Sequence, residues 1–401
     1  MAGDFPKTVP FVQSVYTSNI AVSSTLVALL EAERLRSQGI DVVDLGPGEP
    51  DFPTPEKIKQ AAKQAIDENF TRYTSTSGIP QLKDAIITMM QRDFGAAYTR
   101  KEIIVTVGGK QAIFNAMASI LNPGDEVLMA APYWVTFPEI ARFLQVWPRI
   151  IDTEQSDFLL KAEDVKNAIT GKTRLLIVNS PNNPTGRVIE PAEFTKIVEV
   201  AAEHNILVIS DECYLQFVYP PNKPFTAAQL PKELRDWVIV CGSFSKTYAM
   251  TGWRVGFALG RWEWIDSMLR IQSHSTSNAT SISQKAAIEA ATGPQDSIGV
   301  MLAEYAKRRD WLIPALNQIP GIQCSTPEGA FYAFPNVKGL LGKAISTSDQ
   351  LAQVLLEEAH VVVTPGRAFG TEGYLRISYA TSMETLKKGV ERIAEVAKGL
   401  V

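Results

Sequence analysis

Lys246 lies in the sequence Ser243-Phe-Ser-Lys246, and Arg254 follows eight residues later in Thr251-Gly-Trp-Arg254. Serine hydroxyls and a guanidinium are groups that bind phosphate, and here they flank a single primary amine. The preceding segment 237–241 is apolar and β-branched, which predicts a short buried strand that ends beside the lysine. A lysine in such a place can have a lowered pKa and act as a nucleophile or base. The stretch indicates a site for a phosphate that carries an aldehyde, although a surface lysine in a serine-rich loop would give the same short pattern.

Three other groups of polar residues follow predicted strands. Gly109 and Lys110 open a helix whose free N–H groups can hold a phosphate. Asn183 lies in a turn-rich run, and its side chain can donate to a ring oxygen. Asp211 and Tyr214 place a carboxylate and a phenol at the end of a strand. A buried carboxylate there could stabilise a protonated ring nitrogen. Each group also has an ordinary structural explanation as a glycine-rich turn, a surface turn or a helix cap. Because ligands of open parallel sheets bind beyond the carboxyl ends of the strands, we expect these groups to meet.

The elements that must position these residues are short apolar strands alternating with amphipathic helices. The predicted strands are 103–107, 126–130, 174–178, 206–209, 237–240 and 255–259. Between them, 110–121 and 192–204 place their apolar residues on one helical stripe. This alternation predicts an α/β fold with a mainly parallel central sheet covered by helices.

The pattern changes after about residue 290. A long charged helix is predicted at 301–316, followed by short strands within 329–334 and 374–379 and by a closing helix. A helix at 25–38 and the strand before Gly46 are expected to join this smaller α+β domain, which both chain ends would then form. The predicted division is residues 1–55 for the N-terminal arm and part of the small domain, 56–292 for a large cofactor-binding domain, and 293–401 for a small substrate-closing domain.

Composition excludes several functions. With 39 basic and 43 acidic residues among 401, the net charge of -4 offers no electrostatic footprint for nucleic acid or an anionic membrane. No signal segment or membrane-spanning apolar run is visible. Cys213, Cys241 and Cys324 lie far apart, which argues against a disulfide framework or a metal site. We expect a cytoplasmic protein that acts on small molecules and uses no metal.

Taken together, these motifs resemble the fold-type-I pyridoxal-phosphate enzymes, and specifically the class I aminotransferases of the aspartate aminotransferase family, in its bacterial Ib type. The resemblance runs over nearly the whole chain, and its motifs occur in the family's order. They are Leu45-Gly-Pro-Gly-Glu-Pro-Asp-Phe52, Asn183-Pro-Thr-Gly186, Ser210-Asp-Glu212, Ser243-Phe-Ser-Lys-Thr247, Gly252-Trp-Arg254 and Leu375-Arg-Ile-Ser-Tyr-Ala380.

The resemblance implies pyridoxal 5′-phosphate as the cofactor and assigns residues to each part of it. Lys246 would form the covalent link to the aldehyde and, once freed by substrate, would act as the catalytic base. Asp211 would pair with the pyridinium nitrogen, Asn183 and Tyr214 would bind the ring 3′ oxygen, and Trp134 would stack on the ring. The residues implied at the phosphate are Gly109, Lys110, Ser243, Ser245, Arg254 and, from the neighbouring subunit of a homodimer, Tyr73.

The resemblance also implies a substrate site. The residues it assigns there are Gly48, Trp134, Asn183, Arg376, Lys110, Ser24 and Thr25. Arg376 would bind the α-carboxylate, because a planar guanidinium fork suits a carboxylate better than an ammonium does. Lys110 would bind the distal carboxylate of aspartate or glutamate, unless it serves only the phosphate helix. Closure of the small domain would assemble the site and exclude water.

The implied function is transfer of the amino group of aspartate to 2-oxoglutarate, which forms oxaloacetate and glutamate by a ping-pong mechanism. Transamination of prephenate or aromatic amino acids is the first alternative, because a lysine excludes uncharged substrates less strictly than a bidentate arginine. A pyridoxal-phosphate lyase is a further alternative, since the cofactor residues do not fix which Cα bond breaks. A nicotinamide dehydrogenase is disfavoured because no G-x-G-x-x-G follows a strand.

Overall fold

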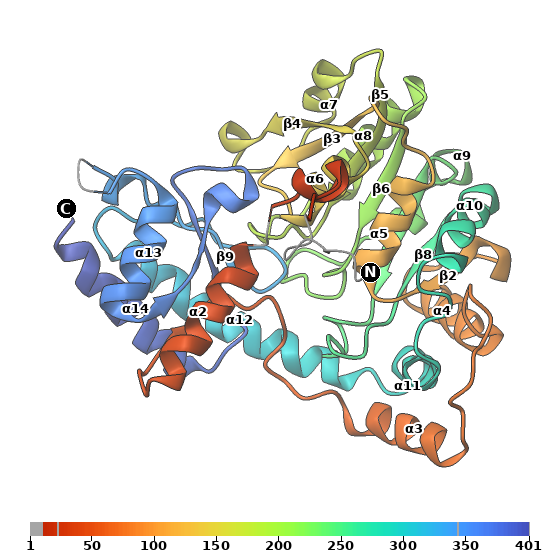
Figure 1. The fold of residues 1–401 in the computed structure, drawn as a ribbon, viewed down its shortest axis with the longest axis horizontal. Coiled ribbons are helices and arrows are strands. Elements are labelled where there is room, and N and C mark those ends of the chain that lie inside the picture. The colour runs from red at the N-terminus through yellow and green to blue at the C-terminus, as the bar shows by residue number, and fades with distance from the viewer. Residues whose placement is uncertain (1–10, 22–23, 343–344, 401) are drawn as a thin grey trace, which may run out of the picture.

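The computed structural model describes residues 11–21, 24–342 and 345–400, and for residues 24–29 it describes the backbone alone. Its centre is a seven-stranded sheet in the order β2-β8-β7-β6-β5-β3-β4 (Figure 1). The strands are β2 (Ile103–Thr106), β8 (Gly256–Leu259), β7 (Val238–Ser243), β6 (Leu207–Asp211), β5 (Thr173–Asn179), β3 (Glu126–Ala131) and β4 (Trp147–Asp152). Strand β8 runs antiparallel to both neighbours, and the other pairings are parallel. The predicted fold class is confirmed.

All six predicted strands of the large sheet are present, and one further strand was missed. Strand β4 lies at the sheet edge, where Trp147 and Ile150 stay exposed to solvent and only Ile151 is buried. Pro148 within it cannot donate to a ladder, which an edge position tolerates. An exposed edge strand needs no apolar run, so the sequence pattern did not indicate it.

Helices cover both faces of the sheet, and its central strands are therefore buried on both sides. On one side are α5 (Gly109–Ala118), α6 (Thr136–Phe143) and α10 (Trp262–Ser273), and the short helix α1 (Val15–Ser18) lies against α6. On the other side are α3 (Glu56–Asp67), α4 (Pro80–Phe94), α7 (Ala162–Ala168), α8 (Pro191–Glu203), α9 (Lys232–Arg235) and α11 (Ser281–Thr292). Pro80 in the first turn and Gly95 at φ +67 after the last turn set the ends of α4.

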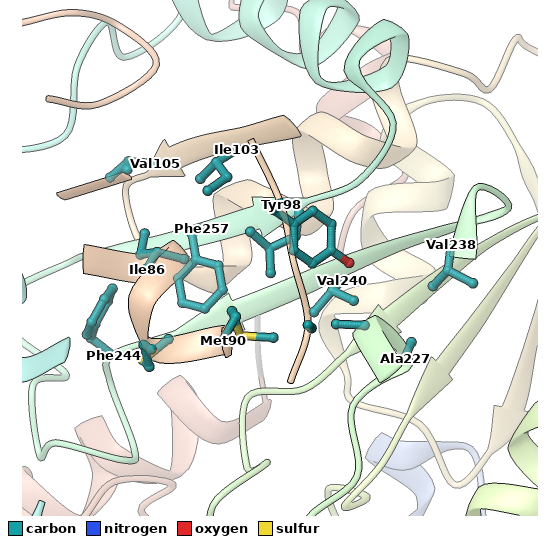
Figure 2. Close-up of a cluster of buried hydrophobic side chains, with 14 of the residues drawn as sticks. Ile86, Met90, Tyr98, Ile103, Val105, Ala227, Val238, Val240, Phe244 and Phe257 are labelled. Atoms are coloured by element: carbon teal, nitrogen blue, oxygen red, sulfur yellow. The ribbon is translucent and has the colours of Figure 1, made fainter. Parts of the chain in front are cut away.

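The core below the strand ends is built from alternating residues of β2 and β7. Ile103 and Val105 point to the side of α4, whereas Ile104 between them joins the opposite cluster. Figure 2 shows Val240, Phe244 and other side chains of the first cluster packed together. Since Phe244 is fully buried in this core, the chain beside it is held in place just after β7 ends.

A second group of elements combines both ends of the chain, drawn in red and blue in Figure 1. Its strands are β1 (Val43–Asp44), paired in parallel with β10 (Val361–Val362), and the antiparallel set β11 (Thr364–Pro365), β12 (Leu375–Ser378) and β9 (Tyr332–Ala333). Its helices are α2 (Ser24–Ser37), α12 (Asp296–Asn317), α13 (Ser348–Ala359) and α14 (Met383–Lys398). Helix α12 begins before residue 301, where its prediction started. The division of the chain at residues 55 and 292 stays a prediction.

Candidate active site

A cavity of about 350 Å³ lies beyond the carboxyl ends of β5, β6 and β7, a volume typical of small-molecule sites. Among the predicted site residues whose side chains the structure describes, every one except Tyr73 lines it. The lining residues are Gly48, Gly109, Lys110, Ile113, Trp134, Val135, Thr136, Asn179, Asn183, Asp211, Cys213, Tyr214, Ser243, Ser245, Lys246, Arg254, Tyr332 and Arg376. The cavity joins the large sheet to strands β9 and β12 of the second group.

Two close backbone approaches shape one end of the cavity. Gly108 has φ +78, and a Cβ there would lie 2.7 Å from Nη2 of Arg254. A Cβ on Gly256 would lie 2.5 Å from the backbone nitrogen of Gly109. The first N–H groups of α5, which have no acceptor within the helix, therefore lie directly against the start of β8, two residues after Arg254. Glycines at both positions are required by this contact.

The hydroxyls of the Lys246 motif complete this end. Ser243 Oγ accepts a hydrogen bond from the Ser245 N–H at 3.1 Å, and the Cβ position of Gly109 lies 3.3 Å from Ser243 Cβ. Arg254 has φ +55, an unfavourable conformation for an arginine, and its Nη1 donates to the Thr251 carbonyl at 3.0 Å. A helix N-terminus, two hydroxyls and a guanidinium thus converge as phosphate-binding groups do.

Asp211 ends β6 at the centre of the cavity and is buried. Burial raises its pKa to about 7, while the Cys213 N–H donates to Oδ1 and opposes that rise. A buried carboxylate of this kind is stabilised when a cation binds to it, such as a protonated ring nitrogen. The adjacent Glu212 points to the other side of the strand, where Oε1 accepts from Ser210 Oγ and the Ala227 N–H.

Asn183 and Tyr214 flank Asp211. The Asn183 N–H donates to Asn179 Oδ1 at 2.9 Å, and Nδ2 of Asn179 donates to the Asp211 carbonyl at 3.0 Å, so the turn after β5 is tied to the end of β6. Tyr214 is buried, and its hydroxyl lies 2.6 Å from the hydroxyl of Tyr332. The structure therefore fixes an amide and a phenol beside the buried carboxylate.

Lys246 is half-buried, and its Nζ donates to the Gly48 carbonyl. Burial lowers the pKa of Lys246, and the positive charges of Arg254 and Arg376 lower it further, against opposing effects of Cys213 and Glu49. A lowered pKa favours the neutral amine, which is the form that attacks an aldehyde or accepts a proton.

Arg376 lies on β12, is 3% exposed, and makes no ion pair with a carboxylate in the described part of the chain. Nη1 donates to Asn183 Oδ1 at 3.1 Å and Nη2 to the Gly46 carbonyl at 2.7 Å, whereas Nε has no partner among the described residues. A buried cation without a counter-ion is costly, so the cavity is suited to an anionic ligand.

Trp134 and Lys110 also line the cavity and contact each other. The Nζ of Lys110 lies 5.1 Å from the centre of the Trp134 ring, within range of a cation–π contact. Lys110 stays exposed as a whole, although partial burial of its amine lowers its pKa, as does the positive charge of Arg254. The cavity therefore has a further cationic side chain besides Arg376, Arg254 and Lys246.

One predicted residue lies outside this cavity, and two others have side chains that the structure does not describe. The side chain of Tyr73 is 92% exposed and lines an open surface depression with Arg72 and residues of the segment 276–282. The backbone of Ser24 and Thr25 begins α2, but their side chains lie outside the described residues. No role of any predicted site residue is tested by position alone, so these roles stay predictions.

Sequence reasoning missed Tyr332, Asn179 and Cys213 in the lining. Asn179 and Cys213 stand next to predicted residues at strand ends, a signal that could have found them. Tyr332 lies within a predicted apolar strand segment, where its pattern is that of an ordinary buried aromatic residue.

The arrangement fits a flat ring with a nitrogen, a hydroxyl, an aldehyde and a phosphate, because matching groups surround one cavity. Arg376 and Lys110 remain for a substrate with carboxylates. Fold and site define an α/β protein whose cavity combines a half-buried lysine with cationic side chains suited to a small anionic molecule.

Comparison with known proteins agrees with this class. The profile of the family Aminotransferase class I and II matches residues 40–393, and the chain belongs to this family. It is 43% identical to an aspartate aminotransferase of Bacillus sp. (strain YM-2), covering 94% of this chain and 96% of the relative, and 41% identical to an aspartate/prephenate aminotransferase of Cereibacter sphaeroides, covering 96% and 98%. A crystal structure of an aspartate aminotransferase from Rhizobium meliloti matches with a TM-score of 0.94 at 42% identity, covering 98% of this chain and all of that one. The protein is an aminotransferase, and the family resemblance seen in the sequence is confirmed.

Among the described residues no helix is long and apolar enough to cross a bilayer. The same residues contain no group of three or more histidine, cysteine, aspartate or glutamate side chains arranged to hold a metal ion.

Proposed function

We propose that this aminotransferase uses pyridoxal 5′-phosphate and transfers the amino group of aspartate to 2-oxoglutarate. The observation that carries the proposal is Arg376, a buried guanidinium without a carboxylate partner in the described chain, facing the same cavity as Lys246 and Asp211. A further cation in the lining, Lys110, supports a substrate with two carboxylates. The names of the relatives support the same substrate.

The residues of this chain would act as follows. Gly109, Ser243, Ser245 and Arg254 bind the phosphate, and Trp134 covers the ring face. When bound, pyridoxal 5′-phosphate supplies an electron sink for a bond at the substrate Cα.

Asp211 then holds a proton at the ring nitrogen, which its burial favours because the pair neutralises both charges. Nζ of Lys246, whose pKa is lowered by burial, would take the proton from the substrate Cα and would deliver it to the former aldehyde carbon of the cofactor in the same half-reaction. In the second half-reaction it would move a proton in the reverse direction. Arg376 orients the substrate by its α-carboxylate, and Gly48 closes over the same group.

We further propose a homodimer in which Tyr73 reaches the phosphate of the neighbouring subunit. The support is that Tyr73 is almost fully exposed and lies outside the cavity of its own chain. We also propose a cytoplasmic location, which the free thiols of Cys213, Cys241 and Cys324 support.

A second candidate activity is transamination of prephenate or aromatic amino acids. The observation that favours it is the contact between Lys110 and Trp134. Because the lysine side chain is flexible, it can move away and leave the Trp134 ring free to contact an aromatic substrate. The relative from Cereibacter sphaeroides carries a name with both substrates.

The test is a screen of amino donors with 2-oxoglutarate, following glutamate formation and the absorption of the bound cofactor. We expect aspartate to give the highest kcat/KM, with measurable turnover of phenylalanine and tyrosine. Formation of a keto acid without 2-oxoglutarate would instead identify a lyase. Failure of aspartate to convert the cofactor absorption would refute the proposed substrate.

A further inference from the structure

Tyr332 makes a contact that the proposed mechanism does not use. Its hydroxyl lies 2.6 Å from that of Tyr214, and both residues are buried and line the cavity. Tyr332 belongs to β9 in the C-terminal part of the chain, whereas Tyr214 follows β6 of the large sheet. The two rings meet edge to face with centres 5.6 Å apart.

Only one hydrogen can lie between these oxygens. Burial raises the pKa of both phenols above their ordinary value, so both are neutral in the working pH range and each carries a single hydrogen. If Tyr214 donates to Tyr332, it has no hydrogen left for a group in the cavity. If Tyr332 donates to Tyr214, the hydrogen of Tyr214 is free to point into the cavity.

The surroundings favour Tyr332 as the donor. The guanidinium of Arg376 lies 4.6 Å from the centre of the Tyr332 ring, and its positive charge lowers the pKa of this phenol against the effect of burial. A phenol next to a cation is the stronger donor of a pair, since the cation stabilises negative charge on its oxygen. The effect of Arg376 on Tyr214 ranks last among the causes of its shift.

Gly48 holds the Tyr332 hydroxyl in place from the other side. A Cβ at Gly48 would lie 2.7 Å from Tyr332 Oη, so only glycine allows this approach. The carbonyl of the same residue accepts the hydrogen bond from Lys246. Tyr332 thus contacts both the tyrosine beside Asp211 and the backbone that holds the lysine amine.

We propose that Tyr332 is a positioning residue for this enzyme: it donates its hydrogen to Tyr214 and so directs the hydrogen of Tyr214 toward the ring oxygen of the bound cofactor. The inference rests on the proposed cofactor and deepens that assignment. A donor at the ring oxygen stabilises negative charge there, and this lowers the pKa of the nitrogen that Lys246 contributes to its link with the cofactor.

Removing the Tyr332 hydroxyl weakens Tyr214 as a donor because neighbouring hydrogen bonds polarise one another. Neighbouring hydrogen bonds strengthen one another by roughly 10–30%. For a hydrogen bond to a charged group, the midpoint of the cofactor absorption should therefore rise by roughly 0.1–0.7 pH unit. If Tyr214 were instead the donor, the same change would release its hydrogen to the ring oxygen, and the midpoint would fall. The sign of the shift therefore tests the direction of the bond.

Other groups that face Lys246 must stay unchanged for this test to apply. They are Cys213, Glu49, Arg254 and Arg376. Cys213 and Arg376 also act on both tyrosines, and Glu49 acts on Tyr332. Tyr332→Phe keeps all of them and keeps the ring below Arg376. The pair of Tyr379 and Tyr219 offers a matched control, because their buried hydroxyls lie 3.2 Å apart in the same apolar cluster but outside the cavity.

The experiment is a pH titration of the visible absorption of wild type, Tyr332→Phe and Tyr379→Phe, each loaded with pyridoxal 5′-phosphate. We expect a higher midpoint in Tyr332→Phe alone, and no further effect of Tyr332→Phe in a Tyr214→Phe background. An unchanged or lower midpoint would overturn the inference while the cofactor assignment stands. A wild type that binds the cofactor without any pH-dependent absorption would overturn both.

A second variant addresses the case in which Tyr332→Phe does not fold. Gly48→Ala pushes a methyl group against the hydroxyl of Tyr332 and should part it from Tyr214, so the midpoint should again rise. A folded Gly48→Ala enzyme with the wild-type midpoint would contradict the inference.

Discussion

Replacing Lys110 by methionine tests the proposed substrate most directly. The change keeps the length of the side chain and its packing on Trp134 but removes the positive charge. Since Arg376 can bind one carboxylate, the second carboxylate of aspartate would be left without a cation. Phenylalanine has no such carboxylate, so its binding should not depend on Lys110.

The expected effect follows from the exposure of the lysine. Two unit charges 4 Å apart attract by about 1 kcal/mol in water and by about 4 kcal/mol at the effective dielectric of a protein surface. Lys110 is exposed at the cavity wall, so screening keeps the effect in the lower part of that range, at about 1–2 kcal/mol. At 1.4 kcal/mol for each factor of ten, kcat/KM for aspartate should fall roughly 5- to 30-fold.

The assay compares kcat/KM for aspartate and phenylalanine in wild type, Lys110→Met and Lys101→Met. Lys101 is an exposed lysine of the short helix Arg100–Glu102 and lies outside the cavity, so its variant should match wild type with both donors. Lys110→Arg should retain aspartate activity and reject phenylalanine more strongly, because the guanidinium fork binds a carboxylate in two places. An equal loss for both donors in Lys110→Met would refute the reasoning and assign Lys110 to the phosphate.

Three further predictions concern the cofactor, the buried acids and the dimer. Lys246→Ala should bind pyridoxal 5′-phosphate but show neither the absorption of a lysine link nor turnover; substantial residual transamination would contradict the assignment. Burial raises the pKa of Asp211 and Glu212 to about 7, so the folded cofactor-free protein binds more protons than the unfolded chain between about pH 4 and pH 7. Its free energy of unfolding should therefore fall as pH rises through that window, by up to about 1.4 kcal/mol per pH unit for each group. Glu212→Gln should reduce this dependence of the unfolding free energy on pH, as measured by denaturation at several pH values. A free energy of unfolding that rises with pH in this window would contradict the prediction. A mixture of inactive Lys246→Ala subunits and Tyr73→Ala subunits should regain activity after the subunits exchange, because one of the two sites in the hybrid dimer then has both Lys246 and Tyr73. A mixture that is no more active than its separate components would argue that Tyr73 is not shared between subunits.

The sequence predicted which residues meet at the strand ends because two simple rules apply there, whereas the roles of those residues stay predictions. Apolar runs predicted β5, β6 and β7, and the polar residues that follow them must lie at one edge of a parallel sheet. Asn183, Asp211 and Lys246 are brought together in this way. Edge strand β4 was not predicted, because its exposed residues do not form the apolar run on which strand prediction depends.

Contacts between distant segments could not be predicted by the same rules. Arg376 was found through a motif of the family resemblance, whereas Tyr332, in an apolar strand segment with no such motif, was not. The hydroxyls of Tyr332 and Tyr214 meet across 118 residues of sequence, and their contact depends on how strand β9 packs against the end of β6. Nothing in either local pattern distinguishes these phenols from the matched pair of Tyr219 and Tyr379, which lies in the same cluster. The difference arises from position alone, because one pair faces a cavity with a buried cation and a lysine and the other does not. The hydroxyl of Tyr379 therefore has only a structural contact, whereas we infer that the hydroxyl of Tyr332 sets the direction of a hydrogen bond at the reacting centre.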